Sequence, residues 1–274
     1  MLRLDGVHFS YNTEGQGIQD VSFELKSGEF AAIIGENGAG KSTICRLCNG
    51  LLKPSSGTVT VAGFDTSNAK TSRIARDVGF LFQNPDRQLC QSTVREEIMF
   101  GMGFAGVSEA EERCSEMLEL FGLDGKKEPF GLSRGERQLV ALASVLAREP
   151  GLMILDEPTT GLDYMECTRI MDHITRLNEN GTTVLMVSHD MEVVLDYAHR
   201  GLVLSGGRLI GDGSVHDIMR DAALLSKASL LPAQIPALAV AIGGRFIDID
   251  RADDMASIVE AEANALAGDS RGEF

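Results

Sequence analysis

The chain has 274 residues, of which 43% are hydrophobic, enough for one large α/β core or for such a core with a small extension. Its formal net charge of −15 argues against nucleic-acid wrapping and against direct adhesion to anionic lipid, because both need basic surfaces. No run approaches the roughly 20 apolar residues that span a bilayer, and the first residues lack the features of a secretory signal. We therefore expect a chain that stays in the cytoplasm and meets a membrane only through partners.

Residues 1–30 predict short antiparallel strands. Residues 7–11 and 21–25 alternate apolar and polar side chains, which is typical of strands with one buried face, and residues 58–62 predict a further strand. Tyr11 ends the first of these segments. One interpretation of Tyr11 is a core aromatic on an edge strand.

An apolar run at residues 30–34 leads into Gly-Glu-Asn-Gly-Ala-Gly-Lys-Ser-Thr at residues 35–43. This sequence satisfies G-x-x-x-x-G-K-[ST] between a predicted strand and a predicted helix. In such a loop the backbone N–H groups converge on phosphate oxygens, Lys41 reaches the β and γ phosphates, and Ser42 can ligate Mg²⁺. The alternative is a glycine-rich turn that merely joins a strand to a helix. The nucleotide-binding residues predicted here are Gly35, Asn37, Gly38, Gly40, Lys41, Ser42 and Thr43.

The cysteines form an odd and scattered set of five, in which only Cys45 and Cys48 have the spacing of a redox or metal pair. Both fall inside the helix predicted after the phosphate loop, and no second pair completes a zinc site. We therefore favour buried, small apolar side chains over redox sensing and expect no disulfide.

Residues 93–127 read as helical, with Ser108 and the acidic residues after it predicting a capped helix start on a solvated face. Further on, Ser133 and Gly135 precede an apolar helix predicted at residues 138–147, where a hydroxyl and a backbone N–H favour an anion. The apolar run 152–155 predicts a buried parallel strand that ends in Asp156 and Glu157.

Two adjacent acids at the carboxyl end of a strand lie where open α/β sheets bind ligands. Asp156 would hold Mg²⁺, and Glu157 would orient or deprotonate the attacking water. Without a phosphate loop, the same two residues before Pro158 would suggest a solvated turn.

The last third of the chain predicts a strand at residues 183–187, followed by His189. A lone histidine after a strand is usually structural. Residues 202–210 predict a hairpin, a final helix begins at Ser214, and residues 226–250 form a small appended unit. A helix is expected over residues 253–266, followed by a disordered tail.

The order and spacing of these motifs resemble the ATP-binding-cassette ATPases over residues 1–225. The resemblance implies an α/β P-loop NTPase with an antiparallel β subdomain, a RecA-like core and a helical subdomain at about residues 90–148, with a small extension at 226–274. It also implies a role for each matched residue. Tyr11 would stack on adenine, and Gln83 would contact Mg²⁺ and the attacking water. Ser133 and Gly135 would donate hydrogen bonds to phosphate from the signature motif. Asp163 would belong to the aspartate loop, and His189 would be the switch residue that contacts the γ-phosphate.

The same resemblance implies that ATP and Mg²⁺ are bound between two cassettes, with the signature of one chain facing the phosphate loop of the other. Its helical subdomain would meet a transmembrane subunit. The usual signature LSGGQ is altered at Arg134 and Glu136. Arg134 either adds positive charge near phosphate or pairs with Glu136, and Glu136 is expected to point toward ribose or toward Arg134.

Residues 82–89, Phe-Gln-Asn-Pro-Asp-Arg-Gln-Leu, are similar to a segment of energy-coupling factor transporter ATPases. In that group a second glutamine, here Gln88, lies on a short helix that contacts the membrane partner, and a Leu-Leu-Pro segment occurs as at 230–232. Cys90 departs from the pattern.

This narrower resemblance implies an ATP-hydrolysing subunit on the cytoplasmic face of the cell membrane that powers uptake of a vitamin or of cobalt or nickel ions. Its partners would be a second cassette, a transmembrane coupling subunit and a membrane substrate-binding subunit. The alternatives are the ATPase of a conventional importer or exporter, or a soluble cassette that acts on nucleic acid or ribosomes. The sequence names neither the solute nor whether the second cassette is an identical chain.

Overall fold

The computed structural model describes residues 1–11, 17–246, 249–251 and 254–260. Within these residues an antiparallel sheet has the strand order β2-β1-β4-β5. The strands expected at residues 7–11, 21–25 and 58–62 are confirmed, except for residues 11 and 62, within the longer strands β1 Leu2–Ser10, β2 Gly17–Leu25 and β4 Ser56–Val61. The short strand β5 Phe64–Asp65 was not expected. The alternation is the physical reason for the sheet, because Leu2 and Leu4 are buried while Arg3 between them is exposed.

The central sheet has the order β10-β9-β3-β8-β7-β6 among the described residues. Its strands are β3 Phe30–Gly35, β6 Val78–Leu81, β7 Leu152–Asp156, β8 Thr183–Val187, β9 Arg200–Ser205 and β10 Arg208–Ser214. All neighbouring pairs are parallel except β9 and β10, which form the expected hairpin. Every residue of β3, β7 and β8 is buried, which explains their continuous apolar runs.

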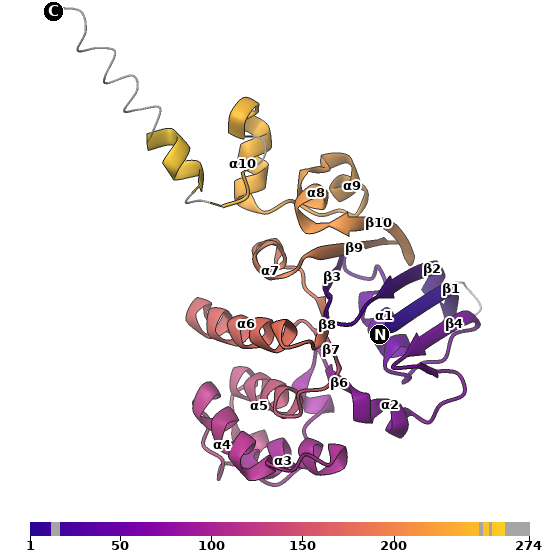
Figure 1. The fold of residues 1–274 in the computed structure, drawn as a ribbon, viewed down its shortest axis with the longest axis vertical. Coiled ribbons are helices and arrows are strands. Elements are labelled where there is room, and N and C mark those ends of the chain that lie inside the picture. Colours follow the sequence, from indigo (N-terminus) through magenta and orange to yellow (C-terminus); the bar gives the residue numbers. More distant parts are fainter. Residues whose placement is uncertain (12–16, 247–248, 252–253, 261–274) are drawn as a thin grey trace, which may run out of the picture.

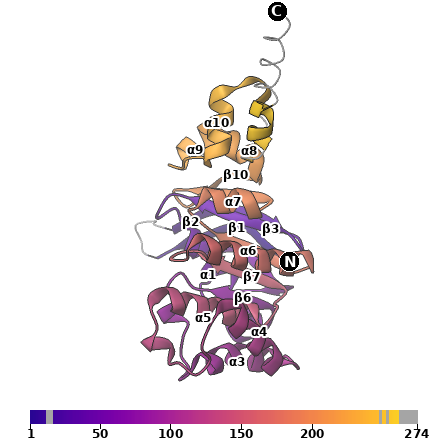
Figure 2. The ribbon, with the colours of Figure 1, turned by 90° about the vertical axis from the view of Figure 1, so that its left-hand side faces the viewer.

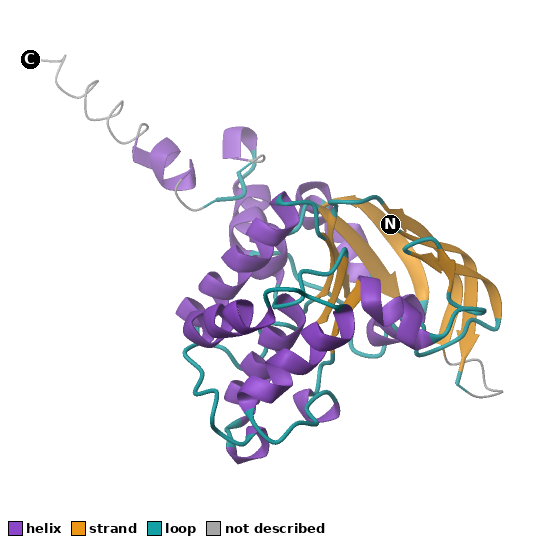
Figure 3. Ribbon diagram, turned by 60° about the horizontal axis from the view of Figure 1, so that its bottom comes forward, coloured by secondary structure: helices purple, strands orange, loops and turns teal. Residues whose placement is uncertain are grey.

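Helix α1, Lys41–Cys48, packs into the core that joins the two sheets, whereas the longer helices cover the other face of the central sheet (Figures 1 and 3). Helices on this second face include α6 Tyr164–Glu179 and α7 Met191–Tyr197. The central sheet is therefore covered on both sides, and its carboxyl edge is where loops and helix starts meet.

The helical subdomain consists of α3 Val94–Ala105, α4 Ala110–Phe121 and α5 Arg134–Leu146, which lie at one end of the molecule (Figure 2). The expected capped start at Ser108 is wrong, because the N-cap of α4 is Glu109 and its side chain makes no cap hydrogen bond. The start expected at residue 138 is also wrong. Helix α5 begins at Arg134 because Ser133 and Glu136 form a capping box. In the chain, α2 Thr71–Asp77 precedes β6, and the short 3₁₀ helices η1 Pro85–Arg87 and η2 Pro129–Gly131 precede α3 and α5.

The chain ends in α8 Val215–Arg220, α9 Ala222–Lys227, α10 Gln234–Ile242 and η3 Gly244–Phe246, with residues 254–260 also helical. The boundary expected at residue 225 falls within α9. The appended unit has a small core of its own, formed by Ala239, Ile249 and Met255. It is joined to α8 by Asp250, whose carboxylate accepts from His216 Nδ1 at 2.5 Å and from Arg220 Nη2 at 2.8 Å.

The helix expected at 253–266 is confirmed over 254–260, and its remainder and the expected disordered tail lie outside the described residues. Among the helices that the structure describes, none combines the length and apolar character needed to cross a membrane.

Candidate functional site

The phosphate loop runs from the end of β3 to the start of α1. Lys41 Nζ donates to the carbonyl oxygens of Gly35 at 2.6 Å and Glu36 at 3.0 Å, so the loop folds around its own lysine. Gly38 and Gly40 have φ values of 86° and 103°, a left-handed conformation that glycine adopts without strain. Gly40 is the N-cap of α1, which directs the first N–H groups of the helix into the loop.

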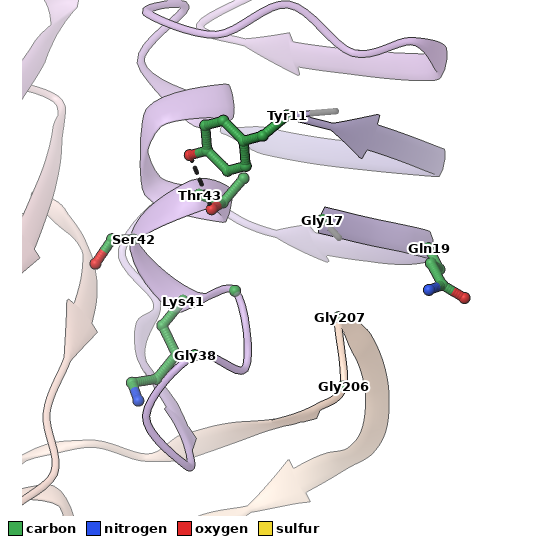
Figure 4. A pocket seen from close by; sticks show the side chains of 10 residues that line it. Tyr11, Gly17, Gln19, Gly38, Lys41, Ser42, Thr43, Gly206 and Gly207 are labelled. Carbon is green, nitrogen blue, oxygen red and sulfur yellow. Dashed lines mark hydrogen bonds between the residues drawn. The ribbon is translucent and has the colours of Figure 1, made fainter. Parts of the chain in front are cut away.

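A cavity of about 670 Å³ opens beside this loop (Figure 4). Its lining residues are Tyr11, Gly17, Gln19, Gly38, Gly40, Lys41, Ser42, Thr43, Gly206 and Gly207. The Tyr11 hydroxyl and Thr43 Oγ1 are 3.1 Å apart and hydrogen-bonded, which ties the aromatic side chain to α1. Tyr11 is 56% exposed, and its ring meets the edge of Phe9 with centroids 4.8 Å apart. The structure therefore leaves much of this aromatic residue accessible beside the phosphate loop.

The turn between β9 and β10 also lines the cavity, although we did not identify it as part of a site from the sequence. Gly207 N–H donates to Ala39 O at 3.1 Å, and Gln19 N–H donates to Gly207 O at 2.8 Å. A Cβ on Gly207 would lie 2.0 Å from Gly17 O, so only glycine fits this approach. The Gly-Gly pair in the predicted hairpin was the available signal, but its contact with the phosphate loop arises from the three-dimensional fold.

Asp156 ends β7 and is 3% exposed. Its Oδ1 is buried without a hydrogen-bond partner in the described part of the chain, and the Ser42 hydroxyl lies near enough to the carboxylate to lower its pKa. Burial raises the pKa of Asp156 above its ordinary value, while Ser42 and then Arg46 and Lys41 oppose that rise. A hydroxyl and an unsatisfied carboxylate oxygen at one point are the donor types that Mg²⁺ prefers, so these residues fit the cation.

Glu157 follows at once but has a different backbone. Its φ of 58° is left-handed, and its N–H donates to Val187 O at 3.0 Å. A left-handed glutamate is strained, and such strain persists only where the surroundings hold it. Here the Gln138 side-chain amide also reaches Glu157 O at 3.4 Å. The turn points the two carboxylates in different directions.

The Glu157 side chain meets the switch histidine predicted from the sequence. His189 Nδ1 lies 2.7 Å from Glu157 Oε2, although 32 residues separate them. Burial raises the pKa of Glu157, and His189 opposes the rise. Conversely, burial lowers the pKa of Lys41, and the charges of Glu157 and Asp156 oppose that fall. Lys41, Asp156, Glu157 and His189 are thus one electrostatically coupled group.

Gln83 and the signature residues lie around a second cavity of about 290 Å³. This cavity is lined by Gln83, Arg134, Gly135, Gln138, Thr160 and Gly161. It shares no lining residue with the phosphate-loop cavity. The structure therefore places neither Gln83 nor Gly135 in the lining of the phosphate-loop cavity.

Ser133 and Asp163 both cap helices in the single chain. Ser133 Oγ accepts from the Glu136 N–H at 3.3 Å, and Glu136 Oε2 accepts from the Ser133 N–H at 2.9 Å. Glu136 also lies 3.7 Å from Lys127 Nζ, and the described residues include no ion pair between it and Arg134. Its expected direction toward ribose stays a prediction. Asp163 caps α6 by accepting from the Glu166 N–H at 2.8 Å.

The remaining expected residues have simpler surroundings. Asn37 is exposed on the phosphate loop. Cys45 and Cys48 are fully buried free thiols whose pKa values are raised by burial, which confirms the small apolar interpretation.

The chain is similar in sequence to known proteins. A protein-family model described as ABC transporter matches residues 18–160. The energy-coupling factor transporter ATP-binding protein EcfA of Methanothermobacter thermautotrophicus is 42% identical over 236 residues, covering 84% of this chain and 76% of that protein. A putative ABC transporter ATP-binding protein of Caldanaerobacter subterraneus is 41% identical over 91% of this chain. The chain spans only 45% and 44% of the first two curated relatives that it matches.

Solved structures agree in fold. CbiO1 from Clostridium perfringens, part of the transporter complex CbiONQ, has a TM-score of 0.68 and 30% identity and covers 86% of this chain and 96% of that one. The dimeric cassette MJ0796, in a post-hydrolysis state with ADP and phosphate, has a TM-score of 0.71 and 28% identity and covers 78% and 99%. The chain belongs to the ABC transporter family as one of its ATPases, and it is similar to ATP-binding subunits of energy-coupling factor transporters.

Proposed function

We propose that the chain is the ATP-binding and ATP-hydrolysing subunit of an energy-coupling factor importer, which takes up a vitamin or cobalt or nickel ions. The observation that carries the hydrolytic part is the group at the end of β7, where Glu157 is paired with His189 and follows Asp156, whose buried Oδ1 has no partner among the described residues. The relatives EcfA and CbiO1 and the segment at residues 82–89 support the transporter class.

In this proposal each residue has one task. Tyr11 stacks on adenine, the phosphate loop binds the phosphates through its backbone and Lys41, and Ser42 and Asp156 hold Mg²⁺. The cation, when bound, neutralises charge on the β and γ phosphates. Glu157 orients or deprotonates the attacking water.

The other polar residues act around the γ-phosphate. His189 contacts it, and its hydrogen bond to Glu157 fixes the position of the carboxylate. Gln83 contacts the cation and the water. Because phosphoryl transfer requires little covalent chemistry from the protein, placement and charge account for most of the catalysis.

A second cassette completes each site. The phosphate-loop cavity and the signature cavity have no lining residue in common, which supports a head-to-tail pair in which each chain completes the other's site. Ser133, Gly135 and Asp163 would then contact the ATP bound by the partner. The dimeric form of MJ0796 supports this arrangement.

The proposed membrane partners are a transmembrane coupling subunit and a substrate-binding subunit, which would hold the chain at the cytoplasmic face. The helical subdomain supports such docking, because the large apolar residues Phe100 and Phe104 of α3 are 57% and 45% exposed. The alternative is a conventional ABC transporter, which has two transmembrane subunits. Copurification from detergent extracts distinguishes these by the subunits recovered.

The central experiment uses Glu157→Gln. This variant should bind ATP with unchanged affinity and lose hydrolysis by about 10²-fold or more, so ATP should hold the pair closed. Light scattering with and without Mg²⁺ and ATP measures the mass. Lys41→Ala is the matched control and should neither bind ATP nor close. A Glu157→Gln chain that stays single with ATP and its partner present would overturn the proposal.

A further inference from the structure

We propose that the segment 84–88 is a rigid link that joins the glutamine loop of this chain to its own signature helix, with Gln88 and Asp86 as positioning residues. The proposal rests on the two-chain function above, because it concerns how the two ATP sites of a pair influence each other. It assigns Gln88 an intramolecular task in place of the partner contact expected from the sequence.

Gln88 uses its whole side-chain amide inside the chain. Its Oε1 accepts from the Phe82 N–H at 3.2 Å, directly before Gln83. Its Nε2 donates to Ala141 O at 2.8 Å and to Ser144 Oγ at 3.1 Å, both on α5. One planar group therefore joins the start of the glutamine loop to the middle of the signature helix.

Asp86 makes a second connection nearer the signature. Its Oδ1 lies 2.7 Å from Arg137 Nε in the first turns of α5. Arg137 Nη1 in turn donates to Leu132 O at 2.6 Å, immediately before Ser133. The Arg137 side chain is 20% exposed, so this ion pair is only partly screened by solvent.

The segment between these contacts is stiff. Asn84 caps η1 by accepting from the Asp86 N–H at 3.1 Å, and Pro85 is buried at the helix start. Further along, Glu97 Oε2 of α3 accepts from the N–H groups of Cys90 and Gln91, each at 2.7 Å. The segment is therefore fixed to α5 and α3 on both sides of Gln88, and it moves with the helical subdomain.

The two ends of the link lie at residues that serve different ATP molecules, and the link therefore has a functional consequence. Gln83 serves the ATP bound by this chain, whereas Ser133 and Gly135 serve the ATP bound by the partner. Gln83 and Gly135 line the same cavity of about 290 Å³. If α5 must move to bring the signature onto the partner's γ-phosphate, the link carries Gln83 with it, so closure at one site sets the geometry of the other.

The experiment measures closure separately from ATP binding. In the Glu157→Gln background, single chains are titrated with a fluorescent ATP analogue at low protein concentration, and closure is followed by light scattering against ATP concentration. Gln88→Ala should leave the affinity of the single chain within about twofold and raise the ATP concentration for half-closure about tenfold. Asp86→Ala and Arg137→Ala should act in the same direction.

Matched variants test whether the link itself is responsible. Gln91→Ala and Arg87→Ala alter neighbouring residues that make no described contact with α5, and both should close as the parent does. The exchanged pair Asp86→Arg with Arg137→Asp should restore closure toward the parent. Because Asp86 is on the surface, this pair remains informative if Gln88→Ala fails to fold.

The outcomes separate the two proposals. A Glu157→Gln parent that never closes contradicts the proposed function. A parent that closes, together with Gln88→Ala and Asp86→Ala variants that close at the same ATP concentration, contradicts the link. Equal losses of single-chain ATP affinity and of closure also contradict it, because the defect would then lie in the phosphate-loop site.

Discussion

Asp156 and Glu157 are adjacent, yet their surroundings give them different chemistry. Asp156 continues β7 and turns its carboxylate toward Ser42, whereas Glu157 turns into the left-handed region and meets His189. Burial raises the pKa of both side chains, so each carboxylate costs stability when it is charged and no ligand is bound. In the proposed function, this loss of stability keeps the two negative charges in place for catalysis.

This cost predicts that Asp156→Asn stabilises the nucleotide-free protein. A raised pKa means that the folded state takes up the proton more readily than the unfolded state, so the charged carboxylate is a penalty above that pKa. Asn removes the charge, and the melting temperature at pH 7.5 should rise by about 2 °C or more. The gain should shrink as the pH falls toward the raised pKa of Asp156, because wild-type Asp156 then becomes neutral.

Calorimetry of both proteins from pH 7.5 to pH 5.5 checks this prediction. Glu116→Gln, which removes an exposed carboxylate of α4, is the control and should change the melting temperature little. A lower melting temperature for Asp156→Asn at pH 7.5 would show that the carboxylate contributes more through its hydrogen bonds than it loses through burial. ATP with Mg²⁺ should stabilise the wild type more than the variant, because the variant lacks a ligand of the cation.

At the scale of elements, a buried acid of α3 holds the segment at Cys90 and Gln91 to the helical subdomain. Glu97 is 3% exposed, and one of its oxygens satisfies two backbone N–H groups that would otherwise be unpaired. Glu97→Ala should therefore lower the free energy of unfolding by about 2 kcal/mol or more. Urea denaturation measures the change.

Two further variants make that measurement specific. Glu97→Gln keeps an acceptor oxygen and should recover part of the loss, whereas Glu116→Ala on the exposed face of α4 should change stability by less than about 0.5 kcal/mol. If Glu97→Ala and Glu116→Ala had the same small effect, the carboxylate would not be what fixes this segment.

The strands show which elements the sequence could predict. The predicted strand 183–187 is confirmed without change, and 152–155 is confirmed with Asp156 added, because continuous apolar runs mark strands buried on both faces. The helix starts were less accurate. The capping box at Ser133 lies outside the apolar periodicity of α5, and α4 starts without the serine cap that its sequence suggests.

The candidate site, like the fold, has one part that the sequence predicts and one part that it does not. The phosphate-loop residues are adjacent in the sequence, so their motif predicted them together, and the structure brings Tyr11 beside them. The Gly207 contact and the Gln88 contacts could not be predicted. Gln88 reaches residues 53 and 56 positions away, and no local pattern encodes which helix packs there.

At the scale of the whole molecule, the separate cavities agree with the proposal that one chain holds half of each site. The phosphate-loop group lies between β3 and α1, whereas the signature lies at the start of α5 beside Gln83 (Figure 1). The appended unit adds a further connection, since the Gln234 N–H donates to Glu192 Oε1 of α7 at 2.7 Å. Helix α7 begins two residues after His189, so the extension contacts the element that follows the proposed switch histidine.

The division into half-sites predicts how two defects behave when they are distributed between chains. We consider pairs of differently tagged copies, purified through both tags. When Lys41→Ala is on one copy and Ser133→Ala on the other, a head-to-tail pair places both defects in one site and leaves the second site intact. When both changes are on the same copy and the other is unaltered, each site carries one defect.

The first pair should therefore hydrolyse ATP about tenfold or more faster than the second, because a lost lysine or phosphate donor removes most of the charge stabilisation in its site. ATP turnover per purified pair is the measurement, and a pair of unaltered copies sets the upper limit. If each chain instead completed its own site, the order would reverse, since both defects on one copy would spare the other copy entirely. The same two substitutions are present in both preparations, so a difference in their number or in general stability cannot produce the predicted order.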